Sequence, residues 1–189
     1  MQSTRQLNNP QPTTHNPQPT TNNQQPTTHN QQPTTNNHFY LLIFNNTKEA
    51  IMQLIDFLNE KDRFAKSIGA QLTELREGYS RAELTVEERH LNGADVCQGG
   101  VIYTLADLAF AGVANGHGLI TLGINNSITI LKSALLGDTI IAEATEVVNH
   151  HRLPYCDIKI SNQNGDIIAI MTGLGYRLKK EFAALKGNE

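Results

Sequence analysis

The segment "GGVIYTLADLAFAGVAN", residues 99–115, constrains the fold more than any other part of this chain. It has the length of a helix, and its large apolar residues lie around nearly the whole circumference, with alanine and glycine between them. A helix that is apolar on nearly every face has to be buried on nearly every face. Its small residues would let a sheet approach the helix backbone closely.

Predicted strands flank this helix on both sides. Before it, "YSRAELTVEE" alternates between apolar and polar residues, which places Ala82, Leu84 and Val86 on one buried face. Four further strands are predicted over 119–131, 139–148, 154–161 and 167–178. Short turns such as "GD" and "NQNGD" join them and require antiparallel neighbours. The sequence therefore predicts an α+β fold, in which one antiparallel β-sheet wraps around a long central helix.

The N-terminal part differs in composition from the rest. Residues 9–36 consist of four seven-residue units, beginning with "NPQPTTH", and residues 1–46 hold one charged side chain and six of the seven prolines. A chain this polar cannot bury enough apolar surface to offset the conformational entropy that it would lose on ordering. Residues 1–46 are therefore expected to be a disordered tail without catalytic or binding residues. A translated tandem DNA repeat, with a native start downstream at Met52, would explain it. Residues 47–189 are predicted to form one domain that opens with a helix over 47–68.

Composition also restricts the partners. The net charge is −3 and no basic cluster is present, which argues against a nucleic-acid partner. Two cysteines make no disulfide framework, so a cytoplasmic location is expected. No secretory signal is visible, and no apolar run reaches the ~20 residues of a membrane span. His150 and His151 lack further ligands at metal-site spacing, and we expect neither a metal nor a cofactor.

Asp107 is the only charged residue in the predicted helix. Burial on all sides would make an ionised carboxylate costly and would raise its pKa. A buried acid of this kind is a candidate general base. The alternative is a structural aspartate that a neighbouring group satisfies.

Gly99 and Gly100 stand where the helix begins. The first N–H groups of a helix have no partner within it, and the helix dipole adds positive charge there. Glycines would let a substrate carbonyl come close, as in an oxyanion hole; a tight loop that needs glycine for its conformation is the alternative. Asp107 lies eight residues beyond Gly99, which is ~12 Å along a helix axis. If both groups act on one substrate, they must come from two chains related by a twofold axis.

The stretch "HLNGADVCQGGVIYTLADLAFAGVAN", residues 90–115, closely resembles the PaaI-like branch of the hotdog-fold acyl-CoA thioesterases. The shared features are an Asn-Gly turn, a Gly-Gly pair at the start of the central helix, and "LAD" further along it. Asn92 precedes Gly99 by seven residues, and Gly99 precedes Asp107 by eight. The similarity covers about 65–180 and implies the hotdog fold.

The resemblance implies hydrolysis of an acyl-CoA thioester with an aromatic or medium-chain acyl group. The Gly99 N–H would polarise the carbonyl, and Asp107 of the partner chain would activate water or attack directly. Asn92 would hold the water or orient the thioester. Substrate contacts are expected from Gln98, Gly100 and His90. The assembly would be a homodimer or a dimer-of-dimers tetramer.

The chain departs from the family pattern at two places. Gln98 stands where the family usually has histidine, and glutamine can form hydrogen bonds there but cannot carry a proton charge. A hydroxyl that some members place after the central helix has its nearest candidate in Thr121.

Parts of the same pattern are compatible with other functions. A non-catalytic acyl-CoA sensor could keep the pocket without turnover, although a binding module gains nothing from an acid that faces the ester. Cys97 could be a nucleophile with His90 as its base, but no third orienting group is evident. A dehydratase would need a histidine near the central helix, and the nearest, His117, lies beyond its end.

Overall fold

The computed structural model describes residues 37–182, with side chains from residue 48 onward. Of the tail over 1–46, which we expect to be disordered, residues 1–36 lie outside the described residues, whereas residues 37–46 belong to the first helix. The elements are α1 (Asn37–Lys61), α2 (Arg63–Ser67), β1 (Gln71–Arg76), β2 (Tyr79–Thr85), the 3-10 turn η1 (Glu88–His90), α3 (Gly99–Asn115), β3 (Leu119–Ile130), β4 (Thr139–Val148), β5 (Tyr155–Asn162) and β6 (Ile167–Glu181). None of these helices is long and apolar enough to cross a bilayer.

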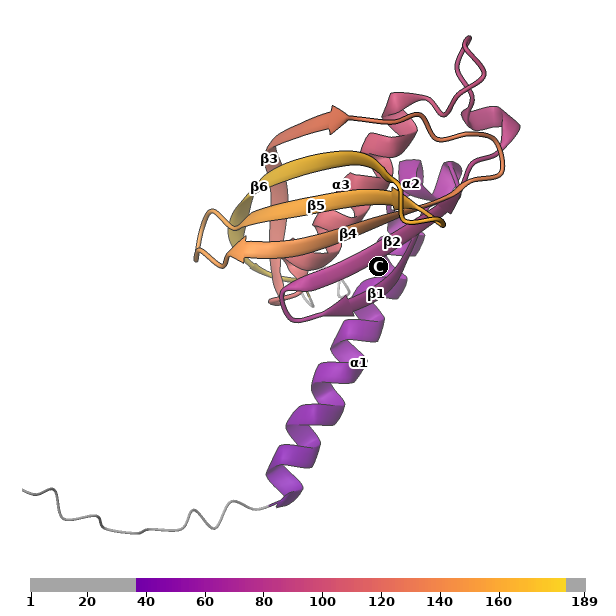
Figure 1. Cartoon of the computed structure of the whole chain (residues 1–189). Helices are drawn as coiled ribbons and strands as arrows, with labels where there is room; N and C mark the ends of the chain where they lie inside the picture. Colours follow the sequence, from indigo (N-terminus) through magenta and orange to yellow (C-terminus); the bar gives the residue numbers. More distant parts are fainter. Residues whose placement is uncertain (1–36, 183–189) are drawn as a thin grey trace, which may run out of the picture. The chain divides into compact units, whose positions relative to one another are not determined.

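One sheet holds all six strands in the order β1-β2-β4-β5-β6-β3, and every neighbouring pair is antiparallel. Helix α3 lies against one face of this sheet and contacts each of the six strands, and Figure 1 shows it behind the curved sheet. The predicted wrapping of an antiparallel sheet around a central helix is confirmed. Strand β3 forms one edge of the sheet and β1 forms the other.

Small residues set the distance between α3 and the sheet. A Cβ added to Gly112 of α3 would lie 2.9 Å from Leu72 Cδ1 and 3.0 Å from Ser80 Cβ. On β6, a Cβ added to Gly173 would lie 2.6 Å from Cδ2 of the Phe110 ring. The distances of 2.9 and 2.6 Å are shorter than non-bonded carbon atoms allow, so glycine at these two positions lets the layers touch.

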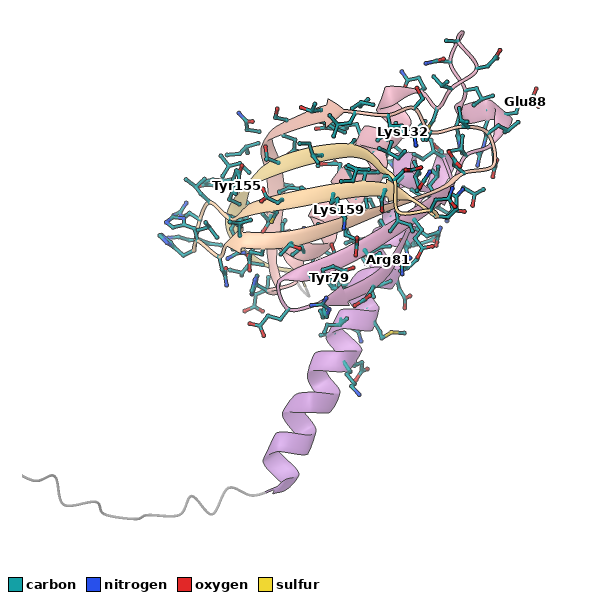
Figure 2. The ribbon with its side chains drawn as sticks, viewed as in Figure 1. Tyr79, Arg81, Glu88, Lys132, Tyr155 and Lys159 are labelled. Carbon is teal, nitrogen blue, oxygen red and sulfur yellow. The ribbon has the colours of Figure 1, made fainter. Side chains whose placement is uncertain are left out.

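The two faces of the sheet differ in polarity, as alternation in the sequence predicts. Ala82, Leu84 and Val86 are at most 2% exposed and belong to the core around α3. The outer face is polar. Tyr79, Arg81 and Lys159 carry their side chains on it (Figure 2), and the Lys159 Nζ lies 3.2 Å from a Glu143 carboxylate oxygen.

The N-terminal helix differs from the prediction over 47–68. It begins ten residues earlier, at Asn37, because the last proline of the repeat is Pro33 and the chain from there to Lys61 contains no helix breaker. It ends at Lys61, because the Asp62 side chain accepts a hydrogen bond from Ala65 N at 3.0 Å and caps a second, short helix.

We predict that Gly173→Ala lowers the free energy of unfolding by about 1–3 kcal/mol, because the new methyl group would overlap the buried Phe110 ring. Chemical denaturation measures this change. Gly93→Ala is the matched control, since a Cβ at Gly93 meets no atom within 4 Å and its backbone needs no left-handed conformation. Equal stability of the two variants would contradict the close-approach argument.

Candidate active site

The loop before α3 is fastened on both sides. Leu91 forms an isolated antiparallel bridge with Cys97, and Gln98 N donates to His90 O at 2.8 Å. From the other side, Cys97 N donates to Ala134 O at 2.9 Å, in the segment that follows β3. These backbone hydrogen bonds fix where α3 begins.

One N–H group at the start of α3 remains available. The Gly100 N–H donates to the side-chain Oε1 of Gln98, and the Val101 N–H donates to Gln98 O at 2.9 Å. The Gly99 N–H has no hydrogen-bond partner among the described residues. A free N–H at a helix N-terminus, where the helix dipole adds positive charge, is the donor that an oxyanion needs.

Gln98 is the N-cap of α3. Its side-chain oxygen occupies the space that a Cβ at position 100 would need, since that Cβ would lie 2.7 Å from Oε1. Glycine at 100 therefore accommodates the cap. The Gly100 N–H is thereby engaged by Gln98, and the Gly99 N–H is the one without a partner among the described residues.

Asn92 and His90, the other two predicted site residues in this loop, differ in exposure. Asn92 is exposed, and its side-chain oxygen accepts from Ala94 N at 2.8 Å, which shapes the turn and leaves its amide N–H groups for a ligand. His90 is only 2% exposed. Its Nδ1 accepts from Glu87 N at 2.9 Å, and its buried Nε2 has no hydrogen-bond partner among the described residues.

Asp107 lies two turns along α3 and is half-buried, not enclosed on all sides as the sequence suggested. The reason is that the sheet leaves one face of α3 uncovered, and Asp107 is on that face together with the exposed Tyr103. Burial and the negative charge of Asp62 raise the pKa of the Asp107 carboxyl, and a hydrogen bond from Asn126 opposes this rise.

The sequence did not point to Asn126 or Tyr103. Asn126 contacts Asp107, and Tyr103 contacts Asn126. Asn126 Nδ2 donates to Asp107 Oδ1 at 2.8 Å and lies 3.2 Å from the Tyr103 hydroxyl. The signal in the sequence was the polar run "NNS" in the middle of a strand with apolar residues on both sides of it. Thr121, the earlier hydroxyl candidate, is buried and donates to Ala114 O at 3.0 Å, so it belongs to the packing at the far end of α3.

The rival nucleophile and bases lie in unsuitable surroundings. Burial raises the pKa of the Cys97 thiol to about 11, so it is protonated at neutral pH. His117 pairs with Glu146 at 2.7 Å, beyond the C-terminal end of α3. His150 Nδ1 accepts from Leu153 N at 2.9 Å and so shapes its own turn, and no cluster of metal-binding side chains occurs in the described part of the chain.

Within one chain, the Gly99 N–H and the Asp107 carboxylate cannot reach the same small group of atoms. The Gly99 N–H and the Asp107 carboxylate are on the same rigid helix, ~12 Å apart along its axis. Both, however, lie along β3. A Cβ on Gly99 would be 3.1 Å from Ile130 Cδ1, and Asp107 is hydrogen-bonded to Asn126.

Comparison with known proteins shows the family of the chain. No family model matches the sequence. A protein of Archaeoglobus fulgidus named "Putative esterase" is 36% identical over 134 residues, which cover 71% of this chain and 87% of that protein. The acyl-coenzyme A thioesterase PaaI of Escherichia coli is 33% identical over 119 residues, 63% of this chain and 85% of the relative.

Solved structures agree. The structure of E. coli PaaI superposes with a TM-score of 0.67 at 30% identity and covers 69% of this chain and 95% of its own. A Streptococcus mutans protein solved with bound acetyl-CoA has a TM-score of 0.58 at 25% identity, covering 60% of this chain and 91% of its own. The chain therefore belongs to the PaaI-like family of hotdog-fold acyl-CoA thioesterases.

Proposed function

We propose that the protein hydrolyses acyl-CoA thioesters at two equivalent sites of a homodimer, each formed by Gly99 of one chain and Asp107 of the other. The observation that carries the proposal is the free Gly99 N–H at the start of α3, with a single acid further along the same helix. The relatives support the chemistry, since E. coli PaaI is named an acyl-CoA thioesterase and the S. mutans protein binds acetyl-CoA.

The reaction follows from these two groups. The Gly99 N–H donates to the thioester oxygen and stabilises the negative charge that develops on it. Asp107 of the partner chain takes a proton from water as the water oxygen attacks the carbonyl carbon. The carbon–sulfur bond then breaks, and the proton passes from Asp107 to the departing thiolate, giving the free acid and CoA. Direct attack by the carboxylate would use the same geometry and form an anhydride first.

The edge strand β3 supports the dimer. It is twelve residues long and presents Leu122, Ile124 and Ile130, which are 47–55% exposed. A long apolar strand with an open edge is a template for pairing with another strand. Two β3 strands paired antiparallel about a twofold axis would cover both edges and join two sheets.

The register of that pairing follows from the site. Asn126 marks the position of Asp107 along β3, and Ile130 marks the position of Gly99. A twofold axis at Ile128 sets Ile130 of one chain opposite Asn126 of the other, across a strand spacing of about 4.8 Å. Residues 126, 128 and 130 also share one face of the strand, as the site requires. The Gly99 N–H then faces the partner's Asp107.

The protein has an apolar surface beside this site for the acyl group of the substrate. Leu131, Leu135 and Leu136 are 55–60% exposed in the segment that is bonded to the loop before α3. Such side chains suit an aromatic or medium-chain acyl group. A dimer of dimers would keep the same sites.

Both cysteines are buried and unpaired, in keeping with a cytoplasmic enzyme.

We predict that the protein releases CoA thiol from at least one aryl-acyl or medium-chain acyl-CoA, and that Asp107→Asn reduces kcat by about 100-fold or more. A thiol-trapping assay across a panel of acyl-CoA esters measures both. Retained binding of an ester without any thiol release would instead indicate the acyl-CoA sensor.

We also predict that Ile128→Cys forms a disulfide-linked dimer under mild oxidation. Residues opposite one another across antiparallel strands have Cα atoms about 4.5–5.5 Å apart, within disulfide range. Ile124→Cys, on the same strand, is the control and should stay unlinked because it does not face itself. Non-reducing electrophoresis measures the fraction of disulfide-linked dimer. Equal cross-linking of the two variants would refute this register.

A further inference from the structure

Tyr103, Asn126 and Asp107 are connected by hydrogen bonds on the face of α3 that the sheet leaves uncovered. The proposed site uses only Gly99 and Asp107, so it does not explain Tyr103 and Asn126. Tyr103 precedes Asp107 by four residues, so the two lie on the same helix face. Asn126 approaches both from the middle of β3. Its Nδ2 is 2.8 Å from Asp107 Oδ1 and 3.2 Å from the Tyr103 hydroxyl oxygen.

The orientation of the Asn126 amide has a physical reason. An amide oxygen would repel the Asp107 carboxylate, whereas the nitrogen has two hydrogens, one for the carboxylate and one for the phenol oxygen. The cost is visible on the other side, where Asn126 Oδ1 is buried without a hydrogen-bond partner in the described part of the chain. Such a cost is tolerated where a charge-assisted bond offsets it.

We propose that Asn126 is a positioning residue for Asp107, and that Tyr103 acts through Asn126 by holding its amide nitrogen toward the carboxylate. The proposal rests on the proposed function, in which Asp107 is the base. Asn126 fixes the rotation of the carboxylate, so that the oxygen that takes the proton from water points out of the helix face. It also favours the charged form of Asp107, the form that can act as a base.

The groups around Asp107 determine in which direction Asn126 shifts the pKa of the carboxyl. Burial and the carboxylate of Asp62, between α1 and α2, raise the pKa of Asp107, and the hydrogen bond from Asn126 lowers it. Tyr103 is the other titratable group that reaches this site, through Asn126. Removing the Asn126 bond therefore raises the pKa of Asp107 further. The active, charged form would then be lost at a higher pH as the solution is acidified.

The test compares Asn126→Leu, Tyr103→Phe and their double variant, with Asn125→Leu as the control. Leucine has nearly the shape of asparagine without its donor, and Asn125 is the exposed neighbour on the same strand. The measurements are the pH dependence of kcat and the titration of the Asp107 carboxyl carbon by NMR, the second of which needs no substrate.

We expect Asn126→Leu to lower kcat by about 10- to 100-fold with little change in KM, and to move both the acid limb and the NMR titration to higher pH. Tyr103→Phe should shift both in the same direction but less, and should add nothing to Asn126→Leu, because it acts through that residue. Asn125→Leu should leave both unchanged.

An unchanged Asp107 titration in Asn126→Leu, or additive effects of the two substitutions, would overturn the proposal. These outcomes are separate from the proposed function. If the wild-type protein hydrolyses esters and Asp107→Asn does not, the function stands even when Asn126 proves irrelevant. If the wild-type protein hydrolyses nothing, the NMR titration still decides whether Asn126 controls the carboxylate.

Discussion

The close approach of the sheet to helix α3 determines most of this structure. Glycine at positions 112 and 173 removes the atoms that would otherwise hold the layers apart, and Phe110 lies directly on the backbone of β6. The sheet can therefore enclose α3 on all sides but one. That remaining side carries Asp107 and adjoins the edge strand β3, so the packing of the core decides where an acid can stand and still reach a ligand.

The rigidity of α3 then dictates how such a site can function. A donor at the first residue of the helix and an acid eight residues later cannot move toward each other, because the helix fixes their separation. Their only route to a common substrate is a second chain. In this account the pairing of two β3 strands is the alignment device of the enzyme, since a shift of one residue would carry the acid away from the N–H that it has to serve.

Much of the fold was predictable from the sequence, and the reasons are local. The apolar run of 99–115 and the alternation of Ala82, Leu84 and Val86 depend only on neighbours along the chain, and both predictions are confirmed. Asn126 was not predicted, because it meets Asp107 across nineteen residues and after a register shift in β3. The engagement of Gln98 with Gly100 was equally hidden, since a glutamine N-cap is set by the loop geometry and not by propensity.

The sharpest measurement is subunit complementation between Gly99→Pro and Asp107→Asn. Proline suits the first position of a helix and the extended backbone of Gln98 before it. Gly99→Pro therefore removes the N–H, and its new Cβ, 3.1 Å from Ile130 Cδ1, displaces only the end of that exposed side chain. Each variant alone should be inactive. After the two are unfolded and refolded together, random pairing should return about a quarter of the wild-type activity, because half of the dimers hold one intact site of two. Mixtures no more active than the separate variants would show that donor and base do not come from different chains.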